Sequence, residues 1–186
     1  MKQAFVDAVQ ERVVLADGPM GTEIYARGFF VNRCYDELNL TNPDTIREIH
    51  ESYAAVGSEI ITTNTFGANR LSLTSYGLED STEEINQRAV QLAKEVAGDN
   101  RYVAGSIDPV LNVFNSDEDR ETIRSSFQEQ ATLLIDGGVD VLILETFTSL
   151  EQLQLAYSAV MDLNPPVPII PSVSLQIFSE TDPKLQ

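Results

Sequence analysis

The sequence contains a single cysteine, Cys34, among its 186 residues. One thiol excludes a disulfide framework within the chain, and it excludes a metal site built from several thiolates of this chain alone. Positive charge is also scarce, because 12 lysine and arginine residues stand against 29 acidic residues and give a formal net charge of -17. Since that charge repels phosphate backbones and anionic lipids, we expect neither nucleic acid nor a membrane surface as a partner.

Long apolar runs are missing as well, and no segment reaches the length that a bilayer requires. The first residues, "MKQAFVDAVQER", carry scattered charges instead of the apolar centre of a signal peptide, so we expect a cytoplasmic protein. The composition, 42% hydrophobic and 22% charged, is that of an ordinary globular chain. No linker or charge block divides it, which predicts one domain over residues 1–186.

Five short segments rich in Val, Ile and Leu predict β-strands that are buried on both faces. They lie near Val13, Ile60, Val103, Leu142 and Ile170. Between them, four segments carry the apolar periodicity of amphipathic helices, at residues 41–57, 81–98, 119–138 and 148–163. Strands that alternate with helices indicate an α/β fold with a parallel sheet and right-handed crossovers.

The N-terminal ends of three of these helices carry residues that are typical of helix starts. Asn42 is placed to cap the first helix, with Pro43 at its first position. Ser81 with Glu84, and Thr148 with Glu151, have the spacing of a capping box at the second and fourth helices.

Two expectations concern which side chains these helices bury. The fourth helix offers Leu150, Leu153, Tyr157 and Val160 to the core. On the first helix, His50 falls on the polar side, which predicts a solvated residue and not a catalytic base.

Two architectures fit the alternation, an open doubly wound sheet and part of a (β/α)8 barrel. A long irregular excursion from Gly18 to Leu40 follows the first strand in either case. Both architectures place ligands at the carboxyl ends of the strands. The polar residues at those ends are therefore the candidate site residues: Asp17, Asn64, Thr65, Ser106 and Glu145.

Asp17 heads the stretch "DGPMG", which raises the question of a phosphate-binding loop. The spacing is not G-x-G-x-x-G, and an aspartate would repel a phosphate, so a nucleotide site is disfavoured. Glu145 ends an apolar strand, where an ionised carboxylate needs a cation or hydrogen-bond donors. Two carboxylates at one edge of the sheet suit an ammonium group. The alternatives are a helix cap or an arginine partner for each carboxylate, and a strand-ending turn for Asn64.

Several of these motifs together resemble the homocysteine S-methyltransferase family, which includes the homocysteine-binding domains of methionine synthases. They are "LADGPMGTEIYARG", "LNLTNPDTIREIHESYAAVGSEIITTNTFGANR", "VAGSI" and "LETF", and the likeness runs from about Val14 to about Leu175. The resemblance implies a (β/α)8 barrel that transfers a methyl group to the thiol of homocysteine, giving methionine. By motif position, Asp17 and Glu145 would contact the amino-acid part of homocysteine, and the strand ends with Asn64, Thr65 and Ser106 would line the same pocket.

The same resemblance implies a zinc cofactor, because the metal deprotonates the thiol to the nucleophilic thiolate. In the family three cysteines hold the zinc, and this sequence has none of them. The sequence ends just after the fifth predicted strand, whereas a complete barrel needs about 250 residues. We therefore expect a homocysteine-binding-type domain with its barrel truncated after about the fifth strand and without methyl transfer on its own. Pro19 and Asp108 also depart from the residues common in the family.

An open barrel of this kind leaves strand edges unpaired, which predicts self-association. Two other functions stay open at this point. One is a non-catalytic binding or scaffold module whose barrel a partner chain completes, and the other is an enzyme of the same fold that acts on a selenol or another thiol. The sequence leaves the methyl donor open too.

Overall fold

The sheet contains four parallel strands in the computed structural model, which describes residues 2–30, 32–110 and 117–175. They are β1 (Ile60–Thr62), β2 (Tyr102–Ile107), β3 (Val141–Phe147) and β4 (Ile169–Val173). Their spatial order is β1-β2-β3-β4, the same as their order along the chain. The described sheet thus has no reversal of strand order, which a doubly wound sheet would have, and it matches consecutive strands of a (β/α)8 barrel. The predicted end of the barrel after β4 falls on residues 176–186, outside the described part.

The first predicted strand was wrong in extent, because the segment near Val13 forms only an isolated parallel bridge between Ala16 and Ile60. The carbonyl of Leu15 accepts from the Ile60 amide at 3.1 Å, and the Asp17 amide donates to the Ile60 carbonyl at 3.2 Å. Val13 is 89% exposed, so the segment lacks the burial that supports a longer strand. The bridge nevertheless places Asp17 beside the end of β1.

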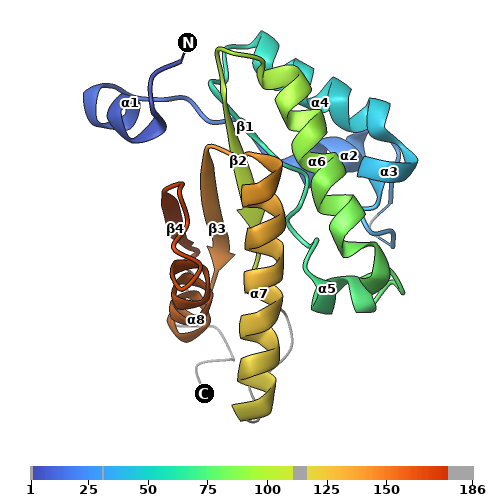
Figure 1. Cartoon of the computed structure of the whole chain (residues 1–186). Coiled ribbons are helices and arrows are strands. Elements are labelled where there is room, and N and C mark those ends of the chain that lie inside the picture. The colour runs from blue at the N-terminus through green and yellow to red at the C-terminus, as the bar shows by residue number, and fades with distance from the viewer. Residues whose placement is uncertain (1, 31, 111–116, 176–186) are drawn as a thin grey trace, which may run out of the picture.

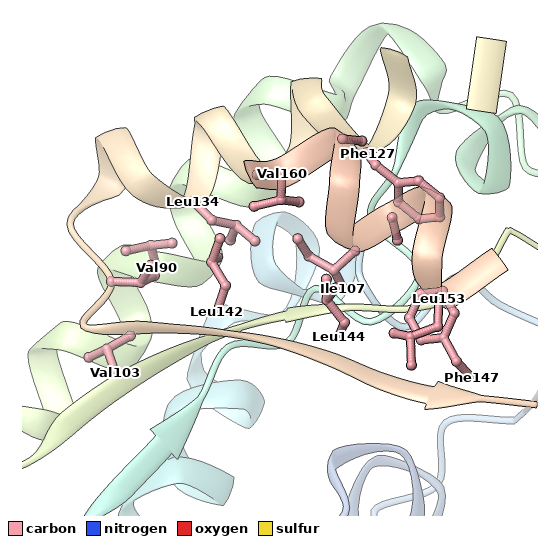
Figure 2. Packing of buried hydrophobic residues seen from close by; sticks show 14 of the residues in the cluster. Val90, Val103, Ile107, Phe127, Leu134, Leu142, Leu144, Phe147, Leu153 and Val160 are labelled. Atoms are coloured by element: carbon pink, nitrogen blue, oxygen red, sulfur yellow. The ribbon is translucent and has the colours of Figure 1, made fainter. Parts of the chain in front are cut away.

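Four helices cover one side of the sheet (Figure 1). They are α4 (Pro43–Ala55), α6 (Thr82–Ala97), α7 (Asp117–Gly137) and α8 (Leu150–Met161), and each contacts the next. The apolar stripes of α6, α7 and α8 meet the sheet in one cluster that includes Phe127 and Leu134 of α7 with Leu142 and Leu144 of β3 (Figure 2). The burial of each such side chain contributes about 1.5–3 kcal/mol to the free energy of unfolding. The helix α1 (Phe5–Glu11) lies apart from this cluster.

The excursion after Asp17 is more ordered than the sequence predicted. It contains α2 (Met20–Ala26) and α3 (Leu38–Thr41). Ile24 and Leu38 of these helices are buried against Ile46 and Ile49 of α4. Further along the chain, α5 (Arg70–Thr74) and the 3-10 turn η1 (Glu79–Ser81) connect β1 to α6.

The predicted capping boxes were both wrong. Ser81 makes no capping hydrogen bond with its side chain, because it belongs to η1, and Thr82 instead donates to the Glu79 carbonyl at 2.7 Å. The N-cap of α8 is Ser149, one residue later than expected, and its hydroxyl accepts from the Gln152 amide at 3.3 Å. Pro43 stands at the first position of α4 as predicted.

The buried face of α8 was only partly right. Leu153 and Val160 are buried, but Leu150 is 63% exposed and Tyr157 is 41% exposed. The helix instead packs through its small residues, Ala156 and Ala159, which bring it close to the sheet. None of the helices in the described residues is long and apolar enough to cross a membrane.

The prediction for His50 was also wrong, because the side chain is fully buried. The reason is that α4 contacts α2, α3, α6 and β1, which leaves it a narrow solvated face. Neither ring nitrogen has a hydrogen-bond partner among the described residues, and burial lowers the pKa of His50 to about 4.

Candidate functional site

A cavity of about 920 Å³ opens at the carboxyl ends of the strands. Four of the five candidate residues line it, namely Asp17, Asn64, Ser106 and Glu145. Thr65 is not among the lining residues. The segment before β1 and the strands β1, β2 and β3 bring these four side chains together, although up to 128 positions separate them in the sequence.

Asp17 is anchored to the end of β1 by Thr62. The Thr62 amide donates to Asp17 Oδ2 at 2.7 Å, and the Thr62 hydroxyl donates to Oδ1 at 2.6 Å. Burial raises the pKa of Asp17, while these two donors oppose the rise by stabilising the charged form. The carboxylate is thus fixed in place, with lone pairs left on both oxygens for a ligand.

The glycine after Asp17 serves packing, not phosphate binding. A Cβ at Gly18 would lie 2.8 Å from the Tyr53 hydroxyl, which itself donates to the Pro19 carbonyl at 3.2 Å. Because a larger residue would have to displace the Tyr53 ring, Gly18 allows α4 to hold this loop at the mouth of the cavity.

Glu145 lies where the pairing of β3 with β4 becomes irregular, between Leu144 and Phe147. The next residue, Thr146, has a φ of 65°, a left-handed conformation that is costly for a β-branched side chain. The Ser106 hydroxyl of β2 donates a hydrogen bond to Glu145 Oε1. Glu145 is therefore oriented by the neighbouring strand, and Oε2 is left out of that bond.

Asn64 and Thr65 both make hydrogen bonds within the scaffold. Asn64 donates to the Tyr35 carbonyl at 2.8 Å, and Asn39 donates back to the Asn64 carbonyl at 2.7 Å, which ties the excursion to the end of β1. Thr65 is fully buried, and its hydroxyl donates to the Ser106 carbonyl at 2.8 Å. Thr65 thus holds the end of β2 without lining the cavity.

Two further carboxyl groups line the cavity and were not among the sequence candidates, Asp36 and Asp108. Burial raises the pKa of Asp36 to about 6. The pKa of Asp108 rises to about 8, first through burial and then through the charge of Asp36. Asp108 directly follows β2, a position equivalent to that of the other candidates. The search for polar residues at the carboxyl ends of the strands could therefore have found it. Asp36 lies in the excursion, where no periodic pattern marks it.

The described residues do not fit the zinc ion that the family resemblance implies. Cys34 is buried, donates to Asp36 Oδ2 at 3.7 Å, and has a pKa raised to about 12 by burial, so its thiol stays protonated. In the ranges that the structure covers, no three His, Cys, Asp or Glu side chains are grouped so that they could hold a metal ion. No step of a reaction is therefore assigned to a metal on these residues.

Comparison with known proteins decides the family. A family model described as homocysteine S-methyltransferase matches residues 14–184. The chain belongs to the homocysteine S-methyltransferase family. Two relatives are the methionine synthases of Mycobacterium tuberculosis and Mycobacterium leprae, each 32% identical over 81% of this chain. The chain spans only 14% of the length of either protein.

Solved structures show the same fold. The metallated form of the homocysteine methyltransferase MmuM from Escherichia coli superposes with a TM-score of 0.74, at 22% identity, over 87% of this chain and 63% of that one. The oxidised form gives a TM-score of 0.75 at 21% identity, over 90% of this chain and 64% of MmuM. The four-stranded sheet is thus similar to part of the barrel of a homocysteine methyltransferase.

Proposed function

We propose that this chain carries the amino-acid-binding part of a homocysteine S-methyltransferase site. The observation that supports the proposal most directly is that Asp17 and Glu145, far apart in the sequence, line one cavity at the carboxyl ends of the strands. The family match supports homocysteine as the amino acid. In this proposal the ammonium group of homocysteine binds to these two carboxylates.

The hydrogen bonds around the two carboxylates suit this role. Thr62 donates twice to Asp17, which favours the ionised form of Asp17. Ser106 donates to Glu145 and orients its carboxylate. A cationic ligand then replaces water next to two fixed charges in a partly buried cavity, where the interaction is stronger than in bulk solvent.

Methyl transfer to homocysteine forms a bond between sulfur and the methyl carbon, breaks the bond between that carbon and its carrier, and releases the thiol proton. The nucleophile is the thiolate, and a free thiol with a pKa near 8.5 is mostly protonated at neutral pH. The described residues include no metal cluster that would ionise it. We therefore propose that the 186-residue chain binds homocysteine without turning it over.

Calorimetric titration with homocysteine tests the binding part. Asp17→Ala and Glu145→Ala should each weaken binding about 10- to 100-fold, because a hydrogen bond to a charged group contributes about 1.5–3 kcal/mol. Asp99→Ala is the matched control, since Asp99 is an exposed carboxylate away from this cavity.

Binding that ignores both substitutions would overturn the proposed ammonium site. A wild-type chain that does not bind homocysteine would instead favour the non-catalytic module that a partner chain completes. Methionine formed by the purified chain with any methyl donor would overturn the proposed lack of turnover.

A further inference from the structure

Residues 66–69 are the last part of the connection from β1 to α5. This loop forms one wall of the cavity. Phe66 and Gly67 line the cavity, as do Leu71 and Ser72 of α5. A hydrogen bond to another part of the chain holds each of the four loop residues, and these bonds come from two directions.

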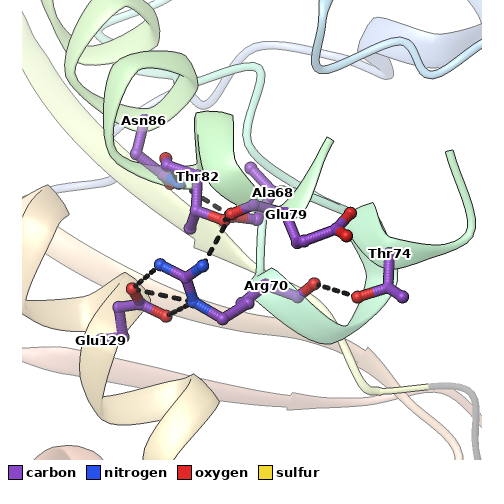
Figure 3. Close-up of polar contacts among 7 residues, drawn as sticks. All are labelled: Ala68, Arg70, Thr74, Glu79, Thr82, Asn86 and Glu129. Atoms are coloured by element: carbon purple, nitrogen blue, oxygen red, sulfur yellow. Dashed lines mark hydrogen bonds and ion pairs between the residues drawn. The ribbon is translucent and has the colours of Figure 1, made fainter. Parts of the chain in front are cut away.

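On the outer side, the loop is held by groups that do not line the cavity. Asn86 of α6 donates to the Ala68 carbonyl at 2.8 Å, and Arg70 forms an ion pair with Glu129 of α7 at 2.6 Å (Figure 3). These contacts fix the loop to the helix layer behind it. They leave its inner side to the cavity residues.

Asp36 holds the loop from the cavity side at Gly67. The Gly67 amide donates to Asp36 Oδ1 at 3.1 Å. A Cβ at Gly67 would lie 3.0 Å from Asp36 Oδ2, closer than ordinary van der Waals contact. A side chain at position 67 would therefore press on the Asp36 carboxylate, which would have to move by a few tenths of an ångström.

Asp108 holds both ends of the same loop. Its amide donates to the Phe66 carbonyl at 3.2 Å, and its Oδ1 accepts from Asn69 Nδ2 at 3.1 Å. Asn69 is the N-cap of α5, because its side-chain oxygen accepts from the Ser72 amide at 2.9 Å. A movement of Asp108 would thus displace Asn69 and, with it, the first turn of α5.

We propose that Asp36 and Asp108 are positioning residues that clamp the 66–69 loop from the cavity side and thereby set the shape of the binding site. They need not touch the ligand for this role. The inference about the loop stands on this geometry alone, and only its effect on homocysteine binding rests on the proposed function.

The ionisation of Asp108 offers a test of the clamp, because a residue with only a structural role would not make the loop respond to pH. Asp108 faces the carboxyl groups of Asp36 and Glu145, and Asp36 in turn faces the Cys34 thiol. With a pKa of about 8, Asp108 is protonated at neutral pH and ionises in mild alkali next to Asp36. Ionisation changes both its hydrogen bond to Asn69 and its repulsion from Asp36, so the loop should respond to pH.

NMR spectra of the full chain between pH 6 and 9 test the clamp. In the wild type and in the control Asp99→Asn, the amide signals of Gly67, Asn69 and Ser72 should titrate together with a midpoint near 8. In Asp108→Asn these signals should lose the step near pH 8, and Gly67 should keep only the step near pH 6 that belongs to Asp36. Their shifts at neutral pH should stay those of the wild type, since an amide oxygen still accepts from Asn69. A step near pH 8 that persists in Asp108→Asn would overturn the inference.

Two further variants test the geometry without ionisation. Asp108→Ala should speed hydrogen exchange at Asn69 and Ser72 at least threefold, and Gly67→Ala should shift the same signals by pressing on Asp36. Unchanged exchange and unchanged signals in both variants would contradict the clamp. If Asp108→Ala does not fold, Gly67→Ala and Asp108→Asn decide alone.

Homocysteine titration then tests the consequence for binding. Asp108→Ala should weaken binding about three- to tenfold, and Asp108→Asn should restore most of the affinity. Equal affinity of the wild type and Asp108→Ala would show that the clamp does not shape the site. A wild-type chain that fails to bind homocysteine would refute the proposed function, and the NMR results would still decide the clamp.

Discussion

The hydroxyl of Ser106, at the end of β2, donates a hydrogen bond to the carboxylate of Glu145, near the end of β3. Asp17 has the same relationship with Thr62, at the end of β1. In both cases a carboxylate at the mouth of the cavity is held by a hydroxyl from the adjacent segment of the sheet. The parallel arrangement of the strands thus supplies both the carboxylates and the donors that fix their directions.

Removing the donor to Glu145 should weaken ligand binding without removing the charge. We expect Ser106→Ala to lower the affinity for homocysteine about three- to tenfold, because one hydrogen bond of about 1 kcal/mol no longer orients the carboxylate. Calorimetric titration at pH 7.5 measures the change. An affinity equal to that of the wild type would show that Ser106 does not orient Glu145 for binding.

Removing the hydroxyl donor to Asp17 should change the pH dependence of binding. Burial already raises the pKa of Asp17, and Thr62→Val should raise it further because only the backbone donor stays. As pH falls, the variant should therefore protonate Asp17 and lose homocysteine at a higher pH than the wild type does. Titrations from pH 5 to 8 compare the two profiles, which would coincide if Asp17 did not bind the ligand.

Asp108→Asn should make the protein more stable in alkali. A carboxyl group whose pKa is raised in the folded state favours folding below its unfolded pKa of about 3.9, and this stability is lost as pH rises through the folded pKa of about 8. Residue 108 of the variant cannot ionise. The difference in free energy of unfolding between the variant and the wild type should therefore grow in favour of the variant from pH 5 to pH 9, to more than about 1 kcal/mol. Urea unfolding at the two pH values measures it, and a constant difference would be inconsistent with this ionisation.

His50→Leu should make the protein less sensitive to acid. The folded pKa of about 4 lies below the unfolded value of about 6.5, so stability is complete above pH 6.5 and is lost as pH falls toward 4. The variant should gain about 1–2 kcal/mol at pH 5, because a buried polar ring without partners among the described residues is also removed. Urea unfolding at pH 5 and 7.5 tests this, and a parallel loss of stability in acid would contradict it.

Thr146→Asn should stabilise the chain by about 1 kcal/mol, because asparagine tolerates the left-handed conformation that is strained for threonine. Thermal unfolding compares the variant with Thr148→Asn, which makes the same substitution two residues away at another exposed position. A variant less stable than the wild type would indicate that the Thr146 side chain makes a contribution larger than the strain.

The sequence predicted well those features that depend on local periodicity. Strands β2, β3 and β4 and the helices α6 and α7 follow directly from apolar patterns. The prediction that every strand is buried on both faces was wrong for β4, where Ile170 and Val173 are exposed. The same patterns could not determine the first strand, which has too little burial around Val13 to extend beyond one bridge. They also misplaced His50, because the number of elements packed around α4 is not encoded in the periodicity of α4 itself.

By itself, the sequence determined the alternation of strands and helices, the net negative charge, and the position of Asp17 and Glu145 directly after apolar segments. These properties are local, since composition and spacing along the chain fix them. Only the tertiary structure decided which hydroxyl holds each carboxylate, and that Asp36 and Asp108 reach the same loop from different parts of the chain. Such contacts join residues tens of positions apart, and their distances and burial exist only after the sheet and its helices have packed.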